Sequence, residues 1–580
     1  MKKYYTDEKN VQILIALLKE HGIKKVIASP GTANVTFVRS VQNDPFFEIY
    51  SSVDERSAAY IACGLAAESG EAVVLSCTGA TASRNYMPGL TEAYYRKLPI
   101  LAVTATQEIA KVGHLVAQVL DRSVMPKDVV RHSVHLPVVK DDTDWWDCEI
   151  KVNNAILELS RHGGGPVHIN LSMDYRFSFN TERLPKVRVI RRITKQSIEF
   201  PSMPKGKVAV FVGSHTKMNK NQIDALERFC ESNNAVVFCD HTSGYKGKYC
   251  VIHSLSSSQR LSDNDILRPD LLIHIGEITG DYSVNNLVGK QVWRVSEDGE
   301  LRDTFGKLSY IFEMPEQDFF EYYIKNEVCD ASYLKICNDY LEQLYNEIPE
   351  LPFSNIWIAK KIHELVPQNS VIHFGILNSL RAWNFFALPQ SVDSNSNVGG
   401  FGIDGCLSSL IGASFVNKDK LYFCIIGDLA FFYDMNVLGN RHIGNNLRIL
   451  LVNNGIGAEF KNFNNVAAQF GESANDFIAA GGHFGNKSHT LVKNYCESLG
   501  FEYLSASNKT EFEQVYERFL TSQILDKPIL LEIFTNSEDE SKALEIITSI
   551  NATVKGRTKA TLRNVLGDDN IRNLKKIIKW

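Results

Sequence analysis

The stretch Leu421-Tyr422-Phe423-Cys424-Ile425-Ile426-Gly427-Asp428-Leu429 is an apolar run that ends in a glycine and an aspartate. An apolar run without polar alternation is typical of a strand that is buried on both faces of a parallel sheet. Comparable runs alternate along the chain with segments of helical apolar spacing, which predicts an α/β fold. The predicted strands span residues 25–29, 46–51, 72–77, 100–104, 166–171, 207–213, 235–239, 270–276, 291–296, 371–375, 421–426, 447–452 and 529–534.

The length of the chain predicts several domains, because 580 residues exceed what one hydrophobic core accommodates. We predict three doubly wound parallel-sheet domains and a basic C-terminal extension. The predicted boundaries are 1–185, 190–345, 350–537 and, for the extension, 538–580. The last 30 residues contain eight Lys and Arg against two Asp, which predicts a helical extension over the domains or a subunit interface, or docking on an acidic partner or membrane surface.

The composition is that of an ordinary globular protein, with 44% hydrophobic and 22% charged residues. A net charge of -5 gives no reason to expect nucleic acid as a ligand. Eleven cysteines without a Cys-x-x-Cys pair predict buried, reduced thiols in a cytoplasmic protein. No run of about 18 apolar residues occurs, so neither secretion nor a membrane span is expected.

Two polar side chains follow neighbouring predicted strands of the third domain. Asp428 follows one strand, and Asn454 follows the next strand 26 positions later. Mg²⁺ prefers oxygen ligands, which these two side chains and the main-chain carbonyl of Ile456 can supply. Gly427 allows close approach of the backbone to phosphates, and a helix starting after Leu429 would offer free N–H groups to an anion. We therefore predict a site for Mg²⁺ and a diphosphate.

A second segment, Asp54-Glu55-Arg56-Ser57-Ala58-Ala59, begins a predicted helix that ends at Gly70. Glu55 lies in its first turn, where an acid most often only compensates the helix dipole. A carboxylate bonded to the aminopyrimidine of thiamine diphosphate would instead activate that cofactor. Together with the metal and diphosphate site, Glu55 predicts an enzyme that uses thiamine diphosphate and Mg²⁺.

The sequence resembles the thiamine diphosphate enzymes of the pyruvate oxidase and acetolactate synthase type, and most closely the SEPHCHC synthase family of menaquinone biosynthesis. The resemblance covers most of residues 8–535. It is densest at 29–32, 53–59, 77–86, 402–405, and 427–429 with 453–455.

This resemblance implies roles for individual residues. Glu55 and Gln118 would be catalytic, and Ile403 would support the bent cofactor. Metal ligands would be Asp428, Asn454 and Ile456. The cofactor-binding residues would be Glu55, Thr78, Asn85, Gly402, Ile403, Gly427, Asp428, Leu429, Ala430, Asn454 and Gly457. The resemblance also implies a homodimer or a dimer of dimers, in which Glu55 of one subunit completes a site on the third domain of the other.

The sequence departs from this family at positions that bind substrate. The family has Ser-Arg-Ser where this chain has Thr32-Ala33-Asn34, and Asn-Arg-Gly where this chain has Asn397-Val398-Gly399. Those arginines bind substrate carboxylates, and neither Ala nor Val replaces a bidentate guanidinium. Glu459 also stands where the family has an apolar residue. We therefore predict a less cationic pocket and a substrate other than that of SEPHCHC synthase.

The predicted activity is decarboxylation of a 2-oxo acid followed by transfer to an acceptor, with no flavin indicated. Acetolactate synthase-like condensation, simple 2-oxo acid decarboxylation and a non-catalytic cofactor-binding scaffold remain alternatives. Other cations near the expected pocket are Arg122 and His442. The candidate substrate residues are Thr32, Asn34, His114, Ser379, Arg381, Glu459 and Lys461.

Overall fold

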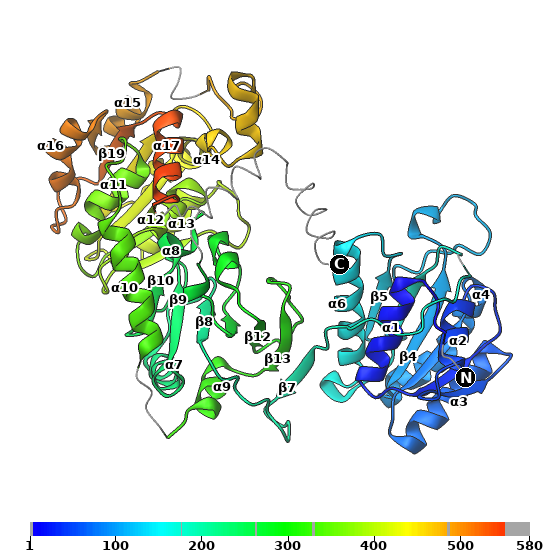
Figure 1. Cartoon of the computed structure of the whole chain (residues 1–580). Coiled ribbons are helices and arrows are strands. Elements are labelled where there is room, and N and C mark those ends of the chain that lie inside the picture. Colours follow the sequence, from blue (N-terminus) through cyan, green and yellow to red (C-terminus); the bar gives the residue numbers. More distant parts are fainter. Residues whose placement is uncertain (1–3, 176, 261–263, 327–330, 484–487, 551–580) are drawn as a thin grey trace. The chain divides into compact units, whose positions relative to one another are not determined.

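The computed structural model describes residues 4–175, 177–260, 264–326, 331–483 and 488–550. It divides into two compact units (Figure 1). The first comprises Met1–Ile198 and Asp298–Glu313, and the second comprises Glu199–Glu297 and Met314–Trp580.

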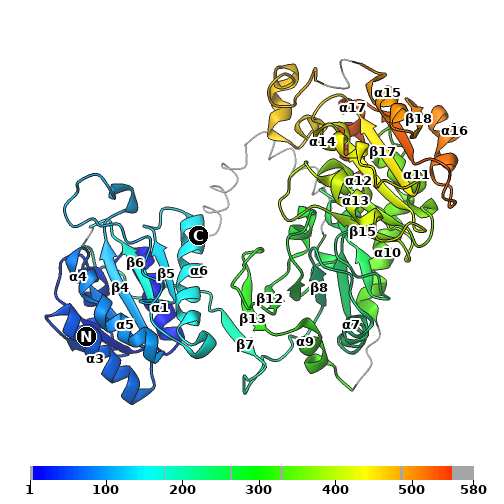
Figure 2. The same ribbon diagram turned by 180° about the vertical axis from the view of Figure 1, so that it is seen from behind.

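The sheet of the first unit has six parallel strands in the order β2-β1-β3-β4-β6-β5. Helices cover both faces, which Figures 1 and 2 view from opposite sides. The core on one face includes residues of α1, α2 and α6, and the core on the other includes residues of α3, α4 and α5. The strands are β1 (Lys25–Ala28), β2 (Glu48–Ser51), β3 (Val73–Cys77), β4 (Ile100–Thr106), β5 (His132–Leu136) and β6 (Val167–Ser172). The helices are α1 (Lys9–Glu20), α2 (Val35–Gln42), α3 (Glu55–Ser69), α4 (Thr81–Asn85), α5 (Met87–Arg96) and α6 (Asp142–Glu158). This unit also contains the parallel pair β7 (Arg191–Thr194) and β13 (Leu308–Glu313).

The second unit begins with a central parallel sheet that includes the order β10-β9-β8-β11-β12. Its strands are β8 (Val208–Val212), β9 (Ala235–Cys239), β10 (Cys250–Ile252), β11 (Leu271–Ile275) and β12 (Gln291–Ser296). Its helices are α7 (Lys220–Asn233), α8 (Ser254–Ser257), α9 (Glu316–Tyr323) and α10 (Ser332–Asn346). The packing of α7 against α9 and β9, and of α10 against β9, places this sheet among helices as expected.

The third sheet lies in the same unit and has the order β15-β14-β16-β17-β19-β18, again entirely parallel. When the strands of each sheet are counted in chain order, this sheet and the first sheet have the same arrangement. The strands are β14 (Val371–Phe374), β15 (Asp393–Ser396), β16 (Tyr422–Gly427), β17 (Leu447–Asn453), β18 (Glu502–Ala506) and β19 (Ile529–Phe534). One face is covered by α11 (Asn355–Ile362), α12 (Asn378–Asn384), α16 (Lys509–Phe519) and α17 (Ser537–Ile547). The other is covered by α13 (Cys406–Ser414), α14 (Asp428–Asp434) and α15 (Leu491–Ser498). Three parallel α/β sheets thus confirm the predicted fold class.

The core of the third sheet continues beyond residue 537, where the sequence placed the start of the extension. Helix α17, red in Figure 1, packs against α11 and buries Ala543, Leu544 and Ile547. The apolar spacing of this helix therefore belongs to the core rather than to an appended segment. The basic residues 551–580 lie outside the described residues.

Buried Glu540 on α17 provides a test of this packing. It accepts hydrogen bonds from the N–H of Asn355 and the hydroxyl of Thr535, and burial raises its pKa to about 7. The folded state therefore binds more protons than the unfolded state between about pH 4.5 and 7, and stability falls as pH rises through this window. We expect Glu540→Gln to raise the free energy of unfolding by about 1–3 kcal/mol at pH 8 and by far less near pH 4.5.

Chemical denaturation at both pH values measures this difference. The control is Glu545→Gln, an exposed position of the same helix that pairs with Lys542. Equal gains for the Glu540 variant at both pH values would contradict the account.

Ten of the eleven cysteines lie in the described residues, and none of these ten forms a disulfide. Nine of the ten are buried, as expected. None of the helices described is both long enough and apolar enough to cross a bilayer.

Candidate active site

The first unit places two predicted segments at adjacent strand ends. Strands β1 and β3 are neighbours at the point where the strand order reverses, which is where open α/β sheets bind ligands. Gly31 follows β1 and Thr78 follows β3. A Cβ atom on Gly31 would lie 2.8 Å from Cβ of Thr78, so the contact of the two loops requires glycine at this position.

Glu55 is the first residue of α3, as the sequence predicts. Its Oε2 accepts a hydrogen bond of 3.4 Å from Nδ2 of Asn85, which joins two of the predicted cofactor residues. The helix does not depend on Glu55 for its start, because Asp54 caps it by accepting from the N–H of Arg56. The Glu55 carboxylate is therefore available for another partner.

Gln118 lies on the exposed loop after β4, with φ at +64°. Its carbonyl oxygen would lie 3.2 Å from a Cβ atom on Gly79, so the loop is close to the turn after β3. Arg122 of the same loop is only 3% exposed and donates to the carbonyl of Ala105. Nε and Nη1 of Arg122 have no hydrogen-bond partner among the described residues, and burial lowers the pKa of its guanidinium to about 10.

Three other candidates of this unit are not joined to Glu55 by the contacts described. Thr32 and His114 are exposed. Asn34 is buried and donates to the carbonyl of Ser29 and the hydroxyl of Ser76. Its amide thus holds the loop after β1.

In the second unit Asp428 begins α14 directly after β16. Its Oδ1 accepts from the N–H of Leu429 at 2.8 Å, and its Oδ2 accepts from the N–H of Gly455 at 2.6 Å. Asp428 is 4% exposed, and burial raises its pKa to about 6 despite these bonds. The sequence placed the helix start after Leu429, but the structure includes Asp428 in the helix.

Asn454 lies in the loop after β17, the strand that pairs with β16. Its Oδ1 accepts from the N–H of Ile456 at 3.2 Å. Gly457 follows, and a Cβ atom there would lie 3.1 Å from the carbonyl oxygen of Ala479. The two strand ends thus place Asp428 and the Asn454 loop side by side, joined by the bond from Gly455.

These oxygens fit a hard cation. No cationic side chain pairs with Asp428 among the residues described, so its buried carboxylate lacks a compensating charge. No cluster of three His, Cys, Asp or Glu side chains occurs in the described ranges. A metal here would therefore take one carboxylate, the Asn454 amide and carbonyl oxygens, a donor set that suits Mg²⁺.

Ile403 follows the loop after β15 and is half-buried. It packs against the cores on both faces of the third sheet. Its neighbour Gly402 is close to the Asp404 carboxylate, which a Cβ atom at Gly402 would overlap. Ile403 is thus held at an edge of both cores, with part of its side chain exposed.

Two candidate substrate residues pair with each other. Arg381 on α12 and Glu459 on the 3-10 helix η7 (Ala458–Lys461) form a bidentate ion pair of 2.7 and 3.2 Å. Ser379 is buried on the same α12. Lys461 donates instead to the carbonyl of Gly471 and to Oδ1 of Asn475, which follow it closely in the chain.

His442 lies in an exposed loop, where its ring packs edge-on against Phe415. Ala33 and Val398, the two positions where the resembling family has arginine, are 4% and 2% exposed. A Cβ atom on Gly280 would lie 3.0 Å from Cγ1 of Val398, so this position packs inside the unit.

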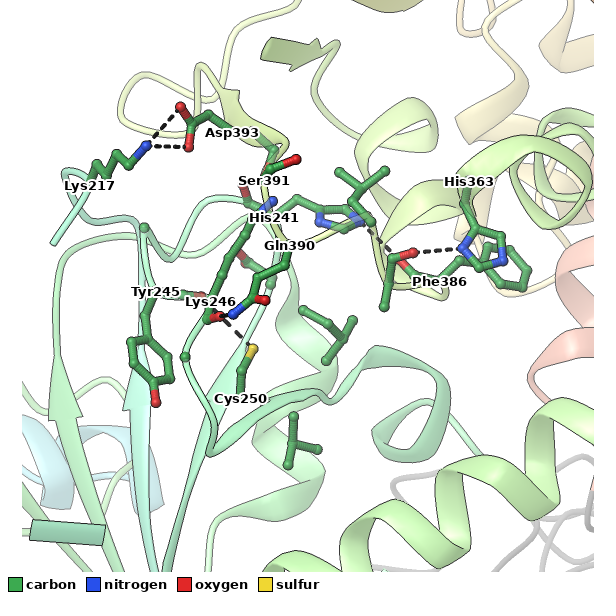
Figure 3. A pocket seen from close by; sticks show the side chains of 18 of the residues that line it. Lys217, His241, Tyr245, Lys246, Cys250, His363, Phe386, Gln390, Ser391 and Asp393 are labelled. Carbon is green, nitrogen blue, oxygen red and sulfur yellow. Dashed lines mark hydrogen bonds and ion pairs between the residues drawn. The ribbon is translucent and has the colours of Figure 1, made fainter. Parts of the chain in front are cut away.

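A cavity of about 1290 Å³ lies elsewhere in the second unit (Figure 3). Its lining includes Val371 and Asp393, the first residues of β14 and β15. The cavity therefore lies at the amino-terminal ends of these strands, whereas Asp428 follows the carboxyl-terminal end of β16. Several of its polar groups are engaged: Lys217 pairs with Asp393, and Gln390 donates to the carbonyl of Lys246. Sequence reasoning did not find this cavity, because its walls come from segments far apart in the chain.

Comparison with known proteins finds a family match in the first unit and relatives that cover most of the chain. Residues 9–125 match the family described as thiamine pyrophosphate enzyme, N-terminal TPP binding domain. The chain is 31% identical over 567 residues to the 2-succinyl-5-enolpyruvyl-6-hydroxy-3-cyclohexene-1-carboxylate synthase (SEPHCHC synthase) of Bacteroides fragilis, with 93% of this chain and 98% of the relative covered. The enzyme of that name from Bacteroides thetaiotaomicron is 30% identical over 569 residues, with the same coverage. That from Flavobacterium johnsoniae is 26% identical over 548 residues, covering 90% of this chain and 95% of the relative.

Proposed function

We propose a specific reaction for this chain on the premise that it belongs to the SEPHCHC synthase family of thiamine diphosphate-dependent enzymes, which decarboxylate and form carbon–carbon bonds. A 2-oxo acid loses CO₂, and its carbonyl carbon is joined to the carbonyl carbon of an acceptor, whose oxygen takes up a proton. The match over 93% of the chain is the observation that supports this proposal most.

Thiamine diphosphate supplies the means to stabilise negative charge at the donor carbon when CO₂ leaves. We assign Glu55 to hold a proton at the aminopyrimidine, with Asn85 orienting its carboxylate. Asp428, Asn454 and the carbonyl of Ile456 would hold Mg²⁺. Ile403 would support the cofactor, and Gln118 would approach the reacting centre.

We further propose that the substrates differ from those of the curated relatives. The name of these relatives describes a product with several carboxylates, which favours a cationic pocket. The two positions where that family has carboxylate-binding arginines are here the buried Ala33 and Val398. Neither supplies a charge or a hydrogen-bond donor from its side chain.

We propose a homodimer or a dimer of dimers in which Glu55 completes a site on the third domain of the partner subunit. A cytoplasmic location is supported by the free thiols of the described cysteines. Size-exclusion chromatography with light scattering tests the assembly, since a monomer that retains full activity would contradict a shared site.

CO₂ release from a panel of 2-oxo acids tests the reaction. We expect the holoenzyme, loaded with thiamine diphosphate and Mg²⁺, to release CO₂ from one of pyruvate, 2-oxobutyrate, 2-oxoglutarate and phosphonopyruvate. Release should stop after chelation with EDTA and return when Mg²⁺ is restored.

The products separate the alternatives. A ligated product that requires an acceptor supports carboligation, whereas aldehyde formed without an acceptor indicates simple decarboxylation. Absence of CO₂ from every acid and acceptor pair, with the cofactor bound, would contradict the proposed reaction.

A further inference from the structure

A closed ring of four polar side chains, here called the polar quartet, is formed by Asn378, Arg381, Glu459 and Asn462. Nη1 of Arg381 donates to Oε2 of Glu459 at 2.7 Å and to Oδ1 of Asn378 at 2.9 Å, and its Nη2 donates to Oε1 of Glu459 at 3.2 Å. Nδ2 of Asn462 closes the ring by donating to Asn378 at 3.1 Å and to Glu459 at 3.2 Å. Each member is therefore held by at least two others.

The quartet lies on elements that follow the carboxyl-terminal ends of strands in the third sheet, as Asp428 does. Asn378 and Arg381 belong to α12, which follows β14, whereas Glu459 belongs to η7, which follows β17. In the sheet β16 lies between β14 and β17, and Asp428 begins the helix directly after β16. The ion pair thus joins the elements that follow the two strands on either side of β16; of these elements, α12, α14 and β17 are labelled in Figure 2.

The quartet has no net charge, and this determines what it can bind. The positive charge of Arg381 is neutralised by the Glu459 carboxylate, both of whose oxygens accept from the guanidinium. The Arg381 side chain is 32% exposed and the Glu459 side chain 25%. A substrate carboxylate approaching Arg381 would have to displace Glu459, which Asn462 also holds, or lie beside its negative charge. Such like-charge contacts are how sites reject a competing ligand.

The quartet retains both hydrogen-bond donors and hydrogen-bond acceptors for a ligand. No bond is described for Nε of Arg381 or Nδ2 of Asn378 within the described residues, and the Glu459 carboxylate can accept further donors. Hydroxyl groups donate and accept, so a compound with several hydroxyls can bond to such a surface without bringing a charge. A carboxylate can only accept.

From this geometry we propose that the polar quartet contacts the acceptor and selects a neutral hydroxylated carbonyl compound, of the hydroxyaldehyde or sugar class, over a carboxylated one. This rests on the proposed function, because it assigns the acceptor of that reaction. It adds that Glu459 is a specificity-determining residue, whose negative charge prevents Arg381 from serving as a carboxylate anchor.

Glu459→Gln tests the proposal, since it removes the charge and keeps the shape. In the holoenzyme we compare kcat/KM for D-glyceraldehyde, a neutral hydroxyaldehyde, with kcat/KM for succinic semialdehyde, an anionic aldehyde, at a fixed 2-oxo acid. Wild type should prefer glyceraldehyde, and the variant should lower this preference by about tenfold or more, as expected when a guanidinium gains a carboxylate partner.

Calorimetric titration with succinate gives a readout that does not depend on turnover. Wild-type holoenzyme should bind succinate weakly, and Glu459→Gln should bind it about tenfold more tightly. The double variant Arg381→Gln with Glu459→Gln should return to weak binding, because the quartet is again uncharged. The matched control is Glu472→Gln, an exposed acid on the neighbouring 3-10 helix η8 (Val466–Ala474).

The outcomes separate the two proposals. Unchanged succinate affinity and unchanged acceptor preference in Glu459→Gln would overturn the role of the quartet. The same succinate gain in Glu472→Gln would also overturn it, because a general charge effect would then suffice. If no acid releases CO₂ with either aldehyde, the proposed reaction fails, while the succinate titration still decides whether Glu459 blocks Arg381.

Discussion

Glu55→Gln should lower turnover of the holoenzyme by about 10²–10⁴, the range typical for loss of a positioned proton-transfer group. Glutamine matches the carboxylate in shape but cannot hold the proton at the aminopyrimidine. Folding should persist, because Asp54 rather than Glu55 caps α3, and the small residues Ala58, Ala59 and Ala62 pack that helix on the sheet. CO₂ release under saturating 2-oxo acid measures the loss.

Glu68→Gln is the matched control, an exposed acid of the same helix with the same change of charge. We expect its turnover and melting temperature to equal those of wild type. The Glu55 variant should retain cofactor binding within a few-fold, so that the loss lies in kcat. Near-normal turnover of Glu55→Gln would reject the proposed role, and loss of the folded state would show that Glu55 supports structure instead.

The strands predicted best are those that lie inside the sheets. The predicted strand at 447–452 is observed as β17 (Leu447–Asn453), and the one at 235–239 coincides with β9. Both are fully buried, so their sequences are continuous apolar runs that stand out from helical patterns. Burial on both faces is the physical reason why these elements could be read from the sequence.

The strands that the sequence did not predict lie at or near sheet edges. β15 (Asp393–Ser396) reads Asp-Ser-Asn-Ser, and β5 and β18 are only partly buried. An edge strand pairs with a neighbouring strand on one side only and is less buried, so its polar residues are tolerated and its apolar pattern is short. Its position comes from pairing with the neighbouring strand, which local sequence does not encode.

In the candidate site, the residues that follow strands could be located from the sequence, whereas contacts between residues far apart in the chain could not. The Gly-Asp and Asn-Asn pattern located Asp428 and Asn454 because each follows a readable buried strand. Arg381 and Glu459 were candidates from their positions, but their pairing was not predicted. They are 78 residues apart and meet only because β14 and β17 flank β16.

Asp428→Asn should remove most of the stabilisation that the cofactor and metal give to the protein. A ligand at 100 times its Kd stabilises the folded state by about 2.7 kcal/mol. Removing a carboxylate from the proposed metal site should lose most of this, because an amide brings no negative charge to the cation. Thermal unfolding with and without thiamine diphosphate and Mg²⁺ measures the difference.

The unliganded variant decides whether this loss belongs to the metal. In the wild type, burial raises the pKa of Asp428 to about 6, so the ionised carboxylate is held at a desolvation cost that the amide removes. Against this, the amide NH₂ must face the N–H of either Leu429 or Gly455, both of which now donate to the carboxylate. Since the two effects oppose each other, we expect the melting temperature without ligand to change less than the melting temperature with ligand. Asp476→Asn, an exposed acid, should retain the full shift. An equal fall of both temperatures in Asp428→Asn would mean that this carboxylate only fastens the loop at Gly455 and does not hold a metal.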